Sequence, residues 1–324
     1  MIQTLIGKST EEAAAFLNEG QIIGIPTETV YGLAGNGLDT AVVSKIFEAK
    51  NRPYFDPLIL HFKSLKAVNE CVESFPTAAK ILAETFWPGP LTLILPKRAI
   101  VPDLVTAGSS GVAVRVPSHE LTLKLLQEIP FPLAAPSANP FKYVSPTSAQ
   151  HVYDQLQNKI PYILDGGNSE IGIESTIVSF LDKTPRILRF GGIPTEEIIK
   201  ICPDVIIDIQ HAPNQHESPG QLEHHYSPNC ILRPFSSTEY ASESEKCVKL
   251  YFKKRADWQE NKAEYFLSES GDLKEAAARF FSVLREFDAK KIEKVYFEWL
   301  PEQGLGRAIN DRLKRASSNY NALG

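Results

Sequence analysis

Residues 49–62 read AKNRPYFDPLILHF, and this stretch combines the end of a helix, a basic turn and a buried strand. The helical pattern before it must stop near Pro53, because proline disfavours helical backbone in the residue that precedes it. Lys50 and Arg52 lie at this helix end, and the apolar run that follows reaches His61. A basic turn beside a buried strand is a candidate site for an anionic ligand.

Each part of this stretch also has a structural explanation. Cations near the C-terminus of a helix interact favourably with the helix dipole, which alone would account for Lys50 and Arg52. A single histidine at the end of an apolar strand, such as His61, is more often a hydrogen-bonded core residue than a ligand. A functional interpretation therefore needs support from the rest of the chain.

Strand-like apolar runs and helical patterns alternate on both sides of this stretch. Ser9 or Thr10 resembles the start of a capping box, and Asp39 can cap a helix that ends at Lys50. Several neighbouring strands are too close in sequence for a crossover helix, so we expect a mixed rather than a purely parallel sheet. This first α/β domain, which has α+β character, is predicted to cover residues 1–202.

Compact polar groups begin or end several of the predicted strands. A glycine-rich turn after the first strand carries Glu28 and Thr29, and glycine lets the backbone approach a ligand closely. The segment FPLAAPSAN ends in Ser137 and Asn139, and GIESTIVSF carries Ser175. Turns of this kind are also ordinary connections between elements, so the glycines alone do not decide between the two interpretations.

Arg115 lies inside the apolar run GVAVRVPSH, where burial of its charge is costly unless an anion pairs with it. A ligand carboxylate or phosphate is one candidate partner, and an Asp or Glu brought close by folding is equally permissible. Further along the chain, Ser145 and Pro146 resemble the N-cap and first residue of a helix. Free N–H groups at such a helix N-terminus can bind phosphate.

Residues 203–232 are rich in Pro, His, Asn and Gln, which is typical of a linker. Their length and the presence of His224, His225 and Tyr226 favour a lid over the first domain. Adjacent histidines without a spaced carboxylate or thiol are weak evidence for a metal, and no protein metal site is predicted. In residues 233–324, three short strands alternate with helices, which predicts a small Rossmann-like domain with a parallel sheet and no phosphate loop.

Composition limits the classes of function. The chain has 324 residues and 43% hydrophobic content, enough for two globular domains. Its formal net charge of -5 argues against a protein that coats nucleic acid, so stable direct tRNA binding is not expected. The N-terminus does not resemble a signal peptide, and no run of about 18 apolar residues occurs. With four cysteines that show neither disulfide nor zinc spacing, a soluble cytoplasmic protein is expected.

A series of motifs gives these features a common explanation. In order, they are PTETVYGL, KNRP, DPLILHF, WPGPLT, VRVPSH, PSAN, SPT and GIESTIV. The series resembles the YrdC-like domain of threonylcarbamoyl-AMP synthases. The later segment SPGQLEHHYSP resembles the linker of the two-domain members of that family, and the small α/β domain matches their architecture.

The resemblance implies an enzyme that joins L-threonine, bicarbonate or CO2, and ATP into threonylcarbamoyl-adenylate and releases pyrophosphate. This is the first step toward threonylcarbamoyladenosine at position 37 of tRNA. The threonine amine can attack CO2, and the carbamate can then attack the α-phosphate, so the protein positions substrates and neutralises charge. Mg²⁺ should accompany ATP, bound mainly by phosphates and water. Downstream tRNA threonylcarbamoyl-transfer proteins would be transient partners.

The resemblance also implies two groups of site residues. As catalytic residues, Lys50 and Arg52 would face the ATP phosphates. The ATP-binding residues would be Lys50, Arg52, Asp56, Ser137, Asn139, Ser145, Arg189 and Tyr226. The threonine-binding residues would be Thr29, His61, Arg115, Ser137 and Ser175.

Two positions depart from the family pattern. Residues 221–224 read Gln-Leu-Glu-His, where relatives usually carry a methionine-basic-aromatic-basic run, so fixed positive charge in the lid is replaced by an acid and a titratable histidine. Asp56 stands where relatives often carry asparagine. A carboxylate near phosphates is unfavourable unless it points away from them or reaches magnesium.

Two other functions are compatible with the motifs. A double-stranded RNA or tRNA-binding module of the same fold would use the cations as phosphate contacts, although the net charge opposes it. Carbamoyl transfer in hydrogenase maturation uses a similar domain. Those chains carry extra acylphosphatase and zinc-finger regions, and the cysteine spacing here excludes the zinc finger.

Overall fold

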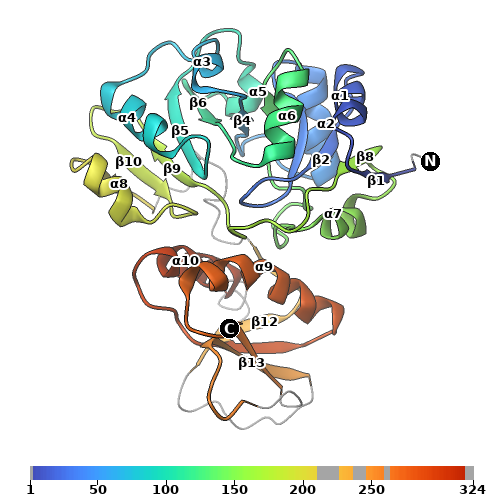
Figure 1. Ribbon diagram of the computed structural model, residues 1–324, viewed down its shortest axis with the longest axis vertical. Coiled ribbons are helices and arrows are strands. Elements are labelled where there is room, and N and C mark those ends of the chain that lie inside the picture. Colours follow the sequence, from blue (N-terminus) through green and yellow to red (C-terminus); the bar gives the residue numbers. More distant parts are fainter. Residues whose placement is uncertain (1–2, 210–225, 236–245, 259–262, 318–324) are drawn as a thin grey trace.

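The computed structural model describes residues 3–209, 226–235, 246–258 and 263–317, which form two stacked domains (Figure 1). The strands of the first sheet are β1 (Leu5–Gly7), β2 (Ile23–Ile25), β3 (Gly32–Asn36), β4 (Ile59–His61), β5 (Leu91–Pro96), β6 (Gly111–Arg115), β7 (Leu133–Ala134), β8 (Tyr162–Leu164), β9 (Thr176–Ser179), β10 (Arg186–Arg189) and β11 (Ile206–Ile207). The order across this sheet is β1-β8-β2-β3-β7-β4-β6-β5-β9-β10-β11. Strand β4 pairs with β6 in parallel, whereas β5 pairs with β6 antiparallel, so the predicted mixed sheet is confirmed.

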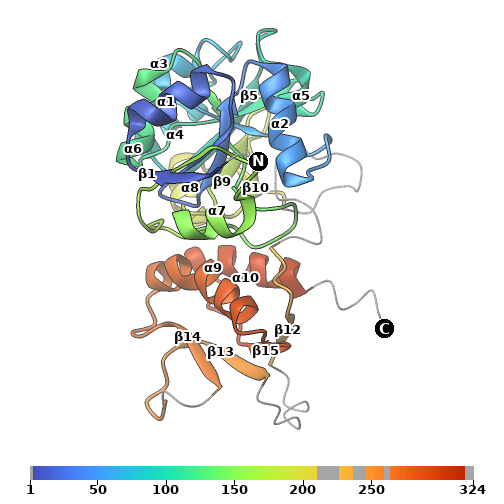
Figure 2. The same cartoon turned by 90° about the vertical axis from the view of Figure 1, so that its right-hand side faces the viewer.

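Helices cover both faces of this sheet. They are α1 (Thr10–Asn18), α2 (Thr40–Lys50), α3 (Leu65–Val68), α4 (Thr77–Phe86), α5 (Asp103–Thr106), α6 (Glu120–Glu128), α7 (Ala149–Leu156) and α8 (Thr195–Ile201). Leu33 and Ala34 are neighbours in β3, yet they pack into different hydrophobic clusters, one with α2 and the other with α1 and α6. Because successive side chains of a strand point to opposite faces, these helices lie on opposite sides of the sheet (Figure 2).

The second domain has a smaller sheet, also within the described residues. Its elements are β12 (Ile231–Pro234), β13 (Cys247–Lys253), β14 (Glu264–Ser268), α9 (Leu273–Ala289), β15 (Lys294–Phe297) and α10 (Leu305–Ser317). The strand order is β12-β15-β13-β14, and all pairs are parallel, as predicted. Within the described ranges, no helix combines the length and apolar character needed to cross a membrane.

Local capping decides where the helices begin and end. Ser9 caps α1 and Asp39 caps α2, as the sequence predicts. Helix α2 ends at Lys50 because Asn51 adopts a left-handed conformation with φ 52°. The prediction for α7 is wrong by three residues: its N-cap is Ser148, whose side chain accepts from the His151 N–H, whereas Ser145 points its hydroxyl elsewhere.

The predicted linker over residues 203–232 differs from the structure at both ends. Strand β11 pairs in parallel with β10 and therefore belongs to the first sheet. Strand β12 begins at Ile231 and belongs to the second sheet. Residues 221–224 and His225 lie outside the described residues, while Tyr226 lies within them.

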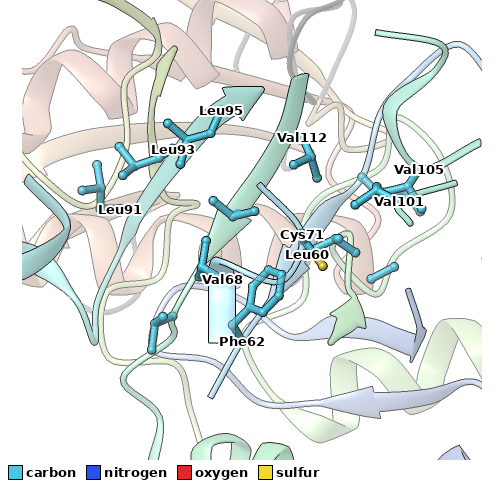
Figure 3. Close-up of a cluster of buried hydrophobic side chains, with 14 of the residues drawn as sticks. Leu60, Phe62, Val68, Cys71, Leu91, Leu93, Leu95, Val101, Val105 and Val112 are labelled. Carbon is cyan, nitrogen blue, oxygen red and sulfur yellow. The ribbon is translucent and has the colours of Figure 1, made fainter. Parts of the chain in front are cut away.

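A large hydrophobic cluster fixes the central strands. Leu91, Leu93 and Leu95 of β5 belong to the same hydrophobic cluster as Leu60 and Phe62, at and just after β4 (Figure 3). This packing sets the neighbouring strands in register, so that His61 of β4 lies opposite Arg115 of β6. Two candidate site residues are thus placed side by side by the core beneath them.

The two domains pack closely against each other. Helices α9 and α10 lie between the second sheet and the first domain (Figure 2). Val30, Val144 and Ile173 of the first domain belong to the same hydrophobic cluster as the helices of the second. Gly172 has φ 74°, and a Cβ at this position would lie closer than 3.0 Å to the backbone of α9. Close contact between the domains therefore requires glycine here.

We expect Gly172→Ala to lower the free energy of unfolding by about 2 to 5 kcal/mol. Alanine would be strained in the left-handed backbone conformation, and its Cβ would clash with α9. Gly108→Ala is a matched control, because Gly108 has φ 79° but nothing within 4 Å of the added carbon. Gly108→Ala should lower the free energy of unfolding by about 1 kcal/mol, because it adds backbone strain without a clash. Urea denaturation of both variants measures the difference, and equal losses would show that the interface is not tight at Gly172.

Candidate active site

A pocket that is partly open to solvent, with a volume of about 50 Å³, lies against the central strands of the first domain. Pro57, Ile59 and His61 line it from alternate positions, at and just before β4, and therefore share one face of that strand. The full lining is Thr27, Thr29, Val30, Gly32, Arg52, Pro57, Leu58, Ile59, His61, Arg115, Ala135, Pro136, Ser137, Glu174, Ser175, Arg189 and Tyr226.

The structure brings eight of the predicted site residues to this pocket. They are Thr29, Arg52, His61, Arg115, Ser137, Ser175, Arg189 and Tyr226. Four others do not line it: Lys50, Asp56, Asn139 and Ser145. Each of these four instead contacts a lining residue or the loop that carries one.

Arg115 obtains its anionic partner from the fold. Its Nη2 donates to Glu28 Oε1 at 2.6 Å, its Nη1 to the Thr29 hydroxyl at 3.0 Å, and its Nε to the Gly89 carbonyl at 3.2 Å. Both side chains of the ion pair are only 4% exposed. Of the two partners that the sequence left open for Arg115, an acidic residue brought close by folding is therefore present.

Arg52 is held in the turn by the residues that follow it. Its Nη2 pairs with Asp56 Oδ1 at 2.9 Å and also donates to the Pro57 carbonyl at 2.9 Å, while its Nε donates to the Asp56 carbonyl. The Asp56 carboxylate thus contacts a guanidinium, which explains how an acid is tolerated at this position. Burial lowers the pKa of Arg52, and the charge of Asp56 partly opposes that effect.

Lys50 has a supporting position. Its ammonium group donates to the backbone carbonyls of Ser137 and Asn139, and its side chain is buried. Burial, followed by the charge of Arg52, lowers the pKa of Lys50 well below its ordinary value. Lys50 therefore fixes the loop that places Ser137 in the pocket. Lys50 does not line the pocket, and a direct contact between its ammonium group and the ATP phosphates stays a prediction.

Asn139 and Ser145 also act through other residues. The Asn139 amide donates to the carbonyls of Pro140 and Tyr143 at 2.8 Å each, and its buried Oδ1 has no hydrogen-bond partner among the described residues. The Ser145 hydroxyl donates to Glu174 Oε1 at 2.6 Å. Glu174 lines the pocket and was not predicted. The segment GIESTIV contains it, but nothing in the sequence separates it from a surface acid.

Ser175 and Arg189, predicted for different substrates, are in direct contact. Arg189 donates to the Ser175 carbonyl at 3.1 Å and to the Ser175 hydroxyl at 3.0 Å. That hydroxyl also shares a 2.7 Å hydrogen bond with Thr92 of β5. The two predicted subsites therefore meet at Ser175.

His61 is neutral over a wide range of pH. Burial, followed by the charge of Arg115, lowers its pKa to about 3. Its Nδ1 lies 3.2 Å from the Ile59 carbonyl, which can only accept a hydrogen bond, and this contact favours the tautomer with the proton on Nδ1. A neutral imidazole adds a polar group to the pocket without adding charge to that of Arg115.

Tyr226 is fixed against the second domain. It is 1% exposed, its backbone has φ 64°, and its ring stacks on Phe281 of α9 with centroids 5.6 Å apart. The Arg312 guanidinium lies 5.4 Å from the centre of the same ring. Burial raises the pKa of Tyr226 to about 12, so its hydroxyl remains protonated.

The arrangement favours binding over covalent catalysis. Arg52, Arg115 and Arg189 surround one pocket, and each is less than 10% exposed. Serine and threonine hydroxyls and a neutral histidine lie between them. A pocket of this kind can bind an anion with several phosphate or carboxylate groups and hold a second polar molecule beside it.

Comparisons with known proteins agree on one family. Residues 15–191 match the family described as "Telomere recombination", and residues 193–318 match "Threonylcarbamoyl-AMP synthase, C-terminal domain". The threonylcarbamoyl-AMP synthase of Pyrococcus abyssi is 39% identical over 319 residues, which cover 94% of this chain and 93% of the relative. That of Bacillus subtilis is 38% identical over 321 residues, with 94% and 92% covered. The crystal structure of P. abyssi Sua5 complexed with L-threonine matches with a TM-score of 0.87 at 35% identity, covering 98% of this chain and 97% of that one.

Removal of the Glu28 carboxylate should be strongly destabilising. In Glu28→Ala, the buried Arg115 would lose its ion-pair partner, and we expect a loss of about 3 to 5 kcal/mol in the free energy of unfolding. Glu84→Ala breaks the exposed pair between Lys80 and Glu84 and should change stability by less than about 0.5 kcal/mol. Guanidinium denaturation tests this, and a small effect of Glu28→Ala would mean that Arg115 has another partner.

His61 should make stability depend on pH. Between pH 6.5 and about 3, the unfolded chain binds a proton at His61 that the folded chain does not, so the free energy of unfolding falls as pH falls. Once the pH is below both pKa values, the total loss in the free energy of unfolding is on the order of a few kcal/mol. In His61→Gln, the difference in melting temperature between pH 7 and pH 5 should shrink. His151→Gln should act in the same direction, because burial lowers the pKa of His151 to about 4. An unchanged difference in His61→Gln would contradict a buried neutral imidazole.

Proposed function

Since this chain belongs to the threonylcarbamoyl-AMP synthase family, we propose that its first-domain pocket binds L-threonine and ATP and joins them with bicarbonate or CO2. The products are threonylcarbamoyl-AMP and pyrophosphate. The observation that carries this assignment is the convergence of Arg52, Arg115 and Arg189 with Ser175 in one pocket. This arrangement suits an amino acid placed beside a triphosphate.

The threonine end is assigned to Thr29, His61, Arg115 and Ser175. Three of the five N–H groups of Arg115 donate to Gly89, Thr29 and Glu28, which leaves two for a ligand carboxylate. These three hydrogen bonds fix the guanidinium before the ligand arrives, and Glu28 offsets its charge. The threonine amine, once deprotonated, attacks CO2, and the carbamate proton leaves to solvent or bicarbonate.

The phosphate end is assigned to Arg52, Arg189 and the Ser137 loop. Lys50 supports that loop through the Ser137 and Asn139 carbonyls, and Asp56 aligns Arg52. In the proposed step, the carbamate oxygen forms a bond to the α-phosphorus while the bond to the β-phosphate oxygen breaks and pyrophosphate leaves. Buried guanidinium groups stabilise the charge that develops on the phosphate oxygens.

Magnesium is proposed as the companion of ATP. Among the described residues, no group of three or more His, Cys, Asp or Glu side chains could hold a metal ion. Mg²⁺ commonly retains water and binds substrate phosphates without a full set of protein ligands, so this pocket is compatible with it. When bound, the ion would neutralise phosphate charge beside the arginines. The adenylate would then pass to tRNA threonylcarbamoyl-transfer proteins of the cytoplasm.

The alternative of an RNA-binding module is less favoured. Such a module needs its cations at the surface, where a polymer backbone can reach them. Arg115 is 3% exposed and Arg189 is 6% exposed, so neither can contact RNA phosphates without opening of the pocket. Burial of the arginines thus favours a small ligand over a polynucleotide.

Pyrophosphate release tests the proposal directly. Purified protein with ATP, Mg²⁺ and bicarbonate should release pyrophosphate only when L-threonine is added, and chromatography should detect an adenylate containing threonine. Omission of bicarbonate and replacement of L-threonine by glycine serve as controls. Folded protein that shows no threonine-dependent release would contradict the assignment. Tight tRNA binding that weakens steeply with salt would then favour the RNA-binding alternative.

A further inference from the structure

Arg312 is the largest fully buried side chain among the described residues, and it connects the second domain to the first. It lies on α10, yet its Nε and Nη2 contact Glu174 Oε2 at 3.2 and 3.1 Å. Its Nη1 donates to the Phe190 carbonyl at 2.6 Å. The same guanidinium lies over the ring of Tyr226. One side chain of the second domain therefore contacts three separate segments of the chain.

All three segments border the pocket. Glu174 and Tyr226 line it, and Phe190 directly follows Arg189, which also lines it. Glu174 uses its other oxygen to accept from Ser145, so both carboxylate oxygens are engaged. The contacts of Arg312 thus include Tyr226, which is assigned to ATP, and Phe190, which follows Arg189 of the phosphate end. His61 and Thr29 at the threonine end are not among them.

A second arginine strengthens this connection. Arg285 of α9 donates to the Ser145 carbonyl at 3.2 Å, to the Val144 carbonyl and to Gln155 Oε1 at 3.0 Å. Ser145 is therefore held from both sides: its backbone by Arg285 and its hydroxyl by the carboxylate that Arg312 binds. The second domain fixes this edge of the pocket at two points.

Stability alone does not require a buried ion pair here. Apolar residues of similar volume often serve as well or better, because the desolvation of two charges offsets much of their attraction. A guanidinium differs from an apolar side chain in the fixed directions of its N–H groups. Its presence is therefore better explained by the need to hold Glu174, Phe190 and Tyr226 in one arrangement.

We propose that Arg312 is a positioning residue for the nucleotide end of the pocket, and that this is a task of the second domain. The proposal rests on the assignment of the pocket to ATP and L-threonine. Arg312 itself contacts no substrate in this scheme. It orients Tyr226, which the family resemblance assigns to ATP, and Glu174, which lines the pocket.

The alternative is that Arg312 only docks the two domains, and Arg307 provides a matched control. Arg307 is also on α10 and also pairs with a glutamate of the first domain, with 3.1 Å between its Nη1 and Glu196 Oε1. Neither Arg307 nor Glu196 lines the pocket. Arg307→Gln therefore removes a bond between the domains without touching the nucleotide end.

Steady-state pyrophosphate release should separate the two explanations. We expect Arg312→Gln to raise KM for ATP about tenfold or more, with KM for L-threonine changed less than about threefold. Arg312→Lys keeps the positive charge but loses the planar guanidinium with its several N–H donors, and it should show a smaller rise in KM for ATP. Arg307→Gln should leave both constants within about twofold of the wild type.

Equal effects of Arg312→Gln and Arg307→Gln, or equal changes in both KM values, would overturn the proposal in favour of simple docking. If Arg312→Gln does not unfold cooperatively, Arg312→Lys decides, and wild-type KM for ATP in that folded variant would overturn the proposal. An inactive wild-type protein would instead contradict the proposed function, so the two failures are distinguishable.

Discussion

The cost of burying arginine dominates the structure of this protein. Arg52, Arg115, Arg189 and Arg312 are all less than 10% exposed, and an uncompensated charge at any of these positions would be strongly destabilising. Each is therefore surrounded by acceptors that the fold supplies, either a carboxylate or backbone carbonyls. These contacts, together with hydrophobic packing, hold the segments around the pocket in place.

The same constraint joins the two domains. Glu174 lies at the edge of the first domain, and its partner Arg312 comes from the last helix of the second. Hydrophobic contacts run beside this ion pair, because Val30, Ile173 and Tyr226 share one cluster with α9 and α10. The pocket wall and the domain interface are consequently continuous at Glu174 and Tyr226, which line the pocket and contact Arg312 of the second domain.

Local signals in the sequence predicted local structure well. Asp39 capped its helix as expected, the apolar runs became strands, and the close spacing of those runs correctly indicated a mixed sheet. The partners of the buried arginines could not be found in this way. Glu28 and Arg115 are 87 residues apart, and Glu174 and Arg312 are 138 apart, so only the tertiary fold reveals either pair. The family resemblance assigned Lys50 to the ATP phosphates, whereas the fold directs its ammonium group to two backbone carbonyls.

Arginines that are already bound to carboxylates of the protein also affect how such a pocket can catalyse a reaction. A guanidinium already bound to a carboxylate adds less to ground-state affinity than a free one, because the ligand must share it. In return, its orientation is fixed before the substrate arrives, so little reorganisation is needed when negative charge moves toward the departing phosphates. Binding that strengthens only as the transition state forms raises the rate, whereas uniform binding does not. In the reaction proposed above, the substrate itself supplies the nucleophile, and the protein's part is to hold charged groups in place. The pairs with Asp56, Glu28 and Glu174 fix the guanidinium groups of Arg52, Arg115 and Arg312.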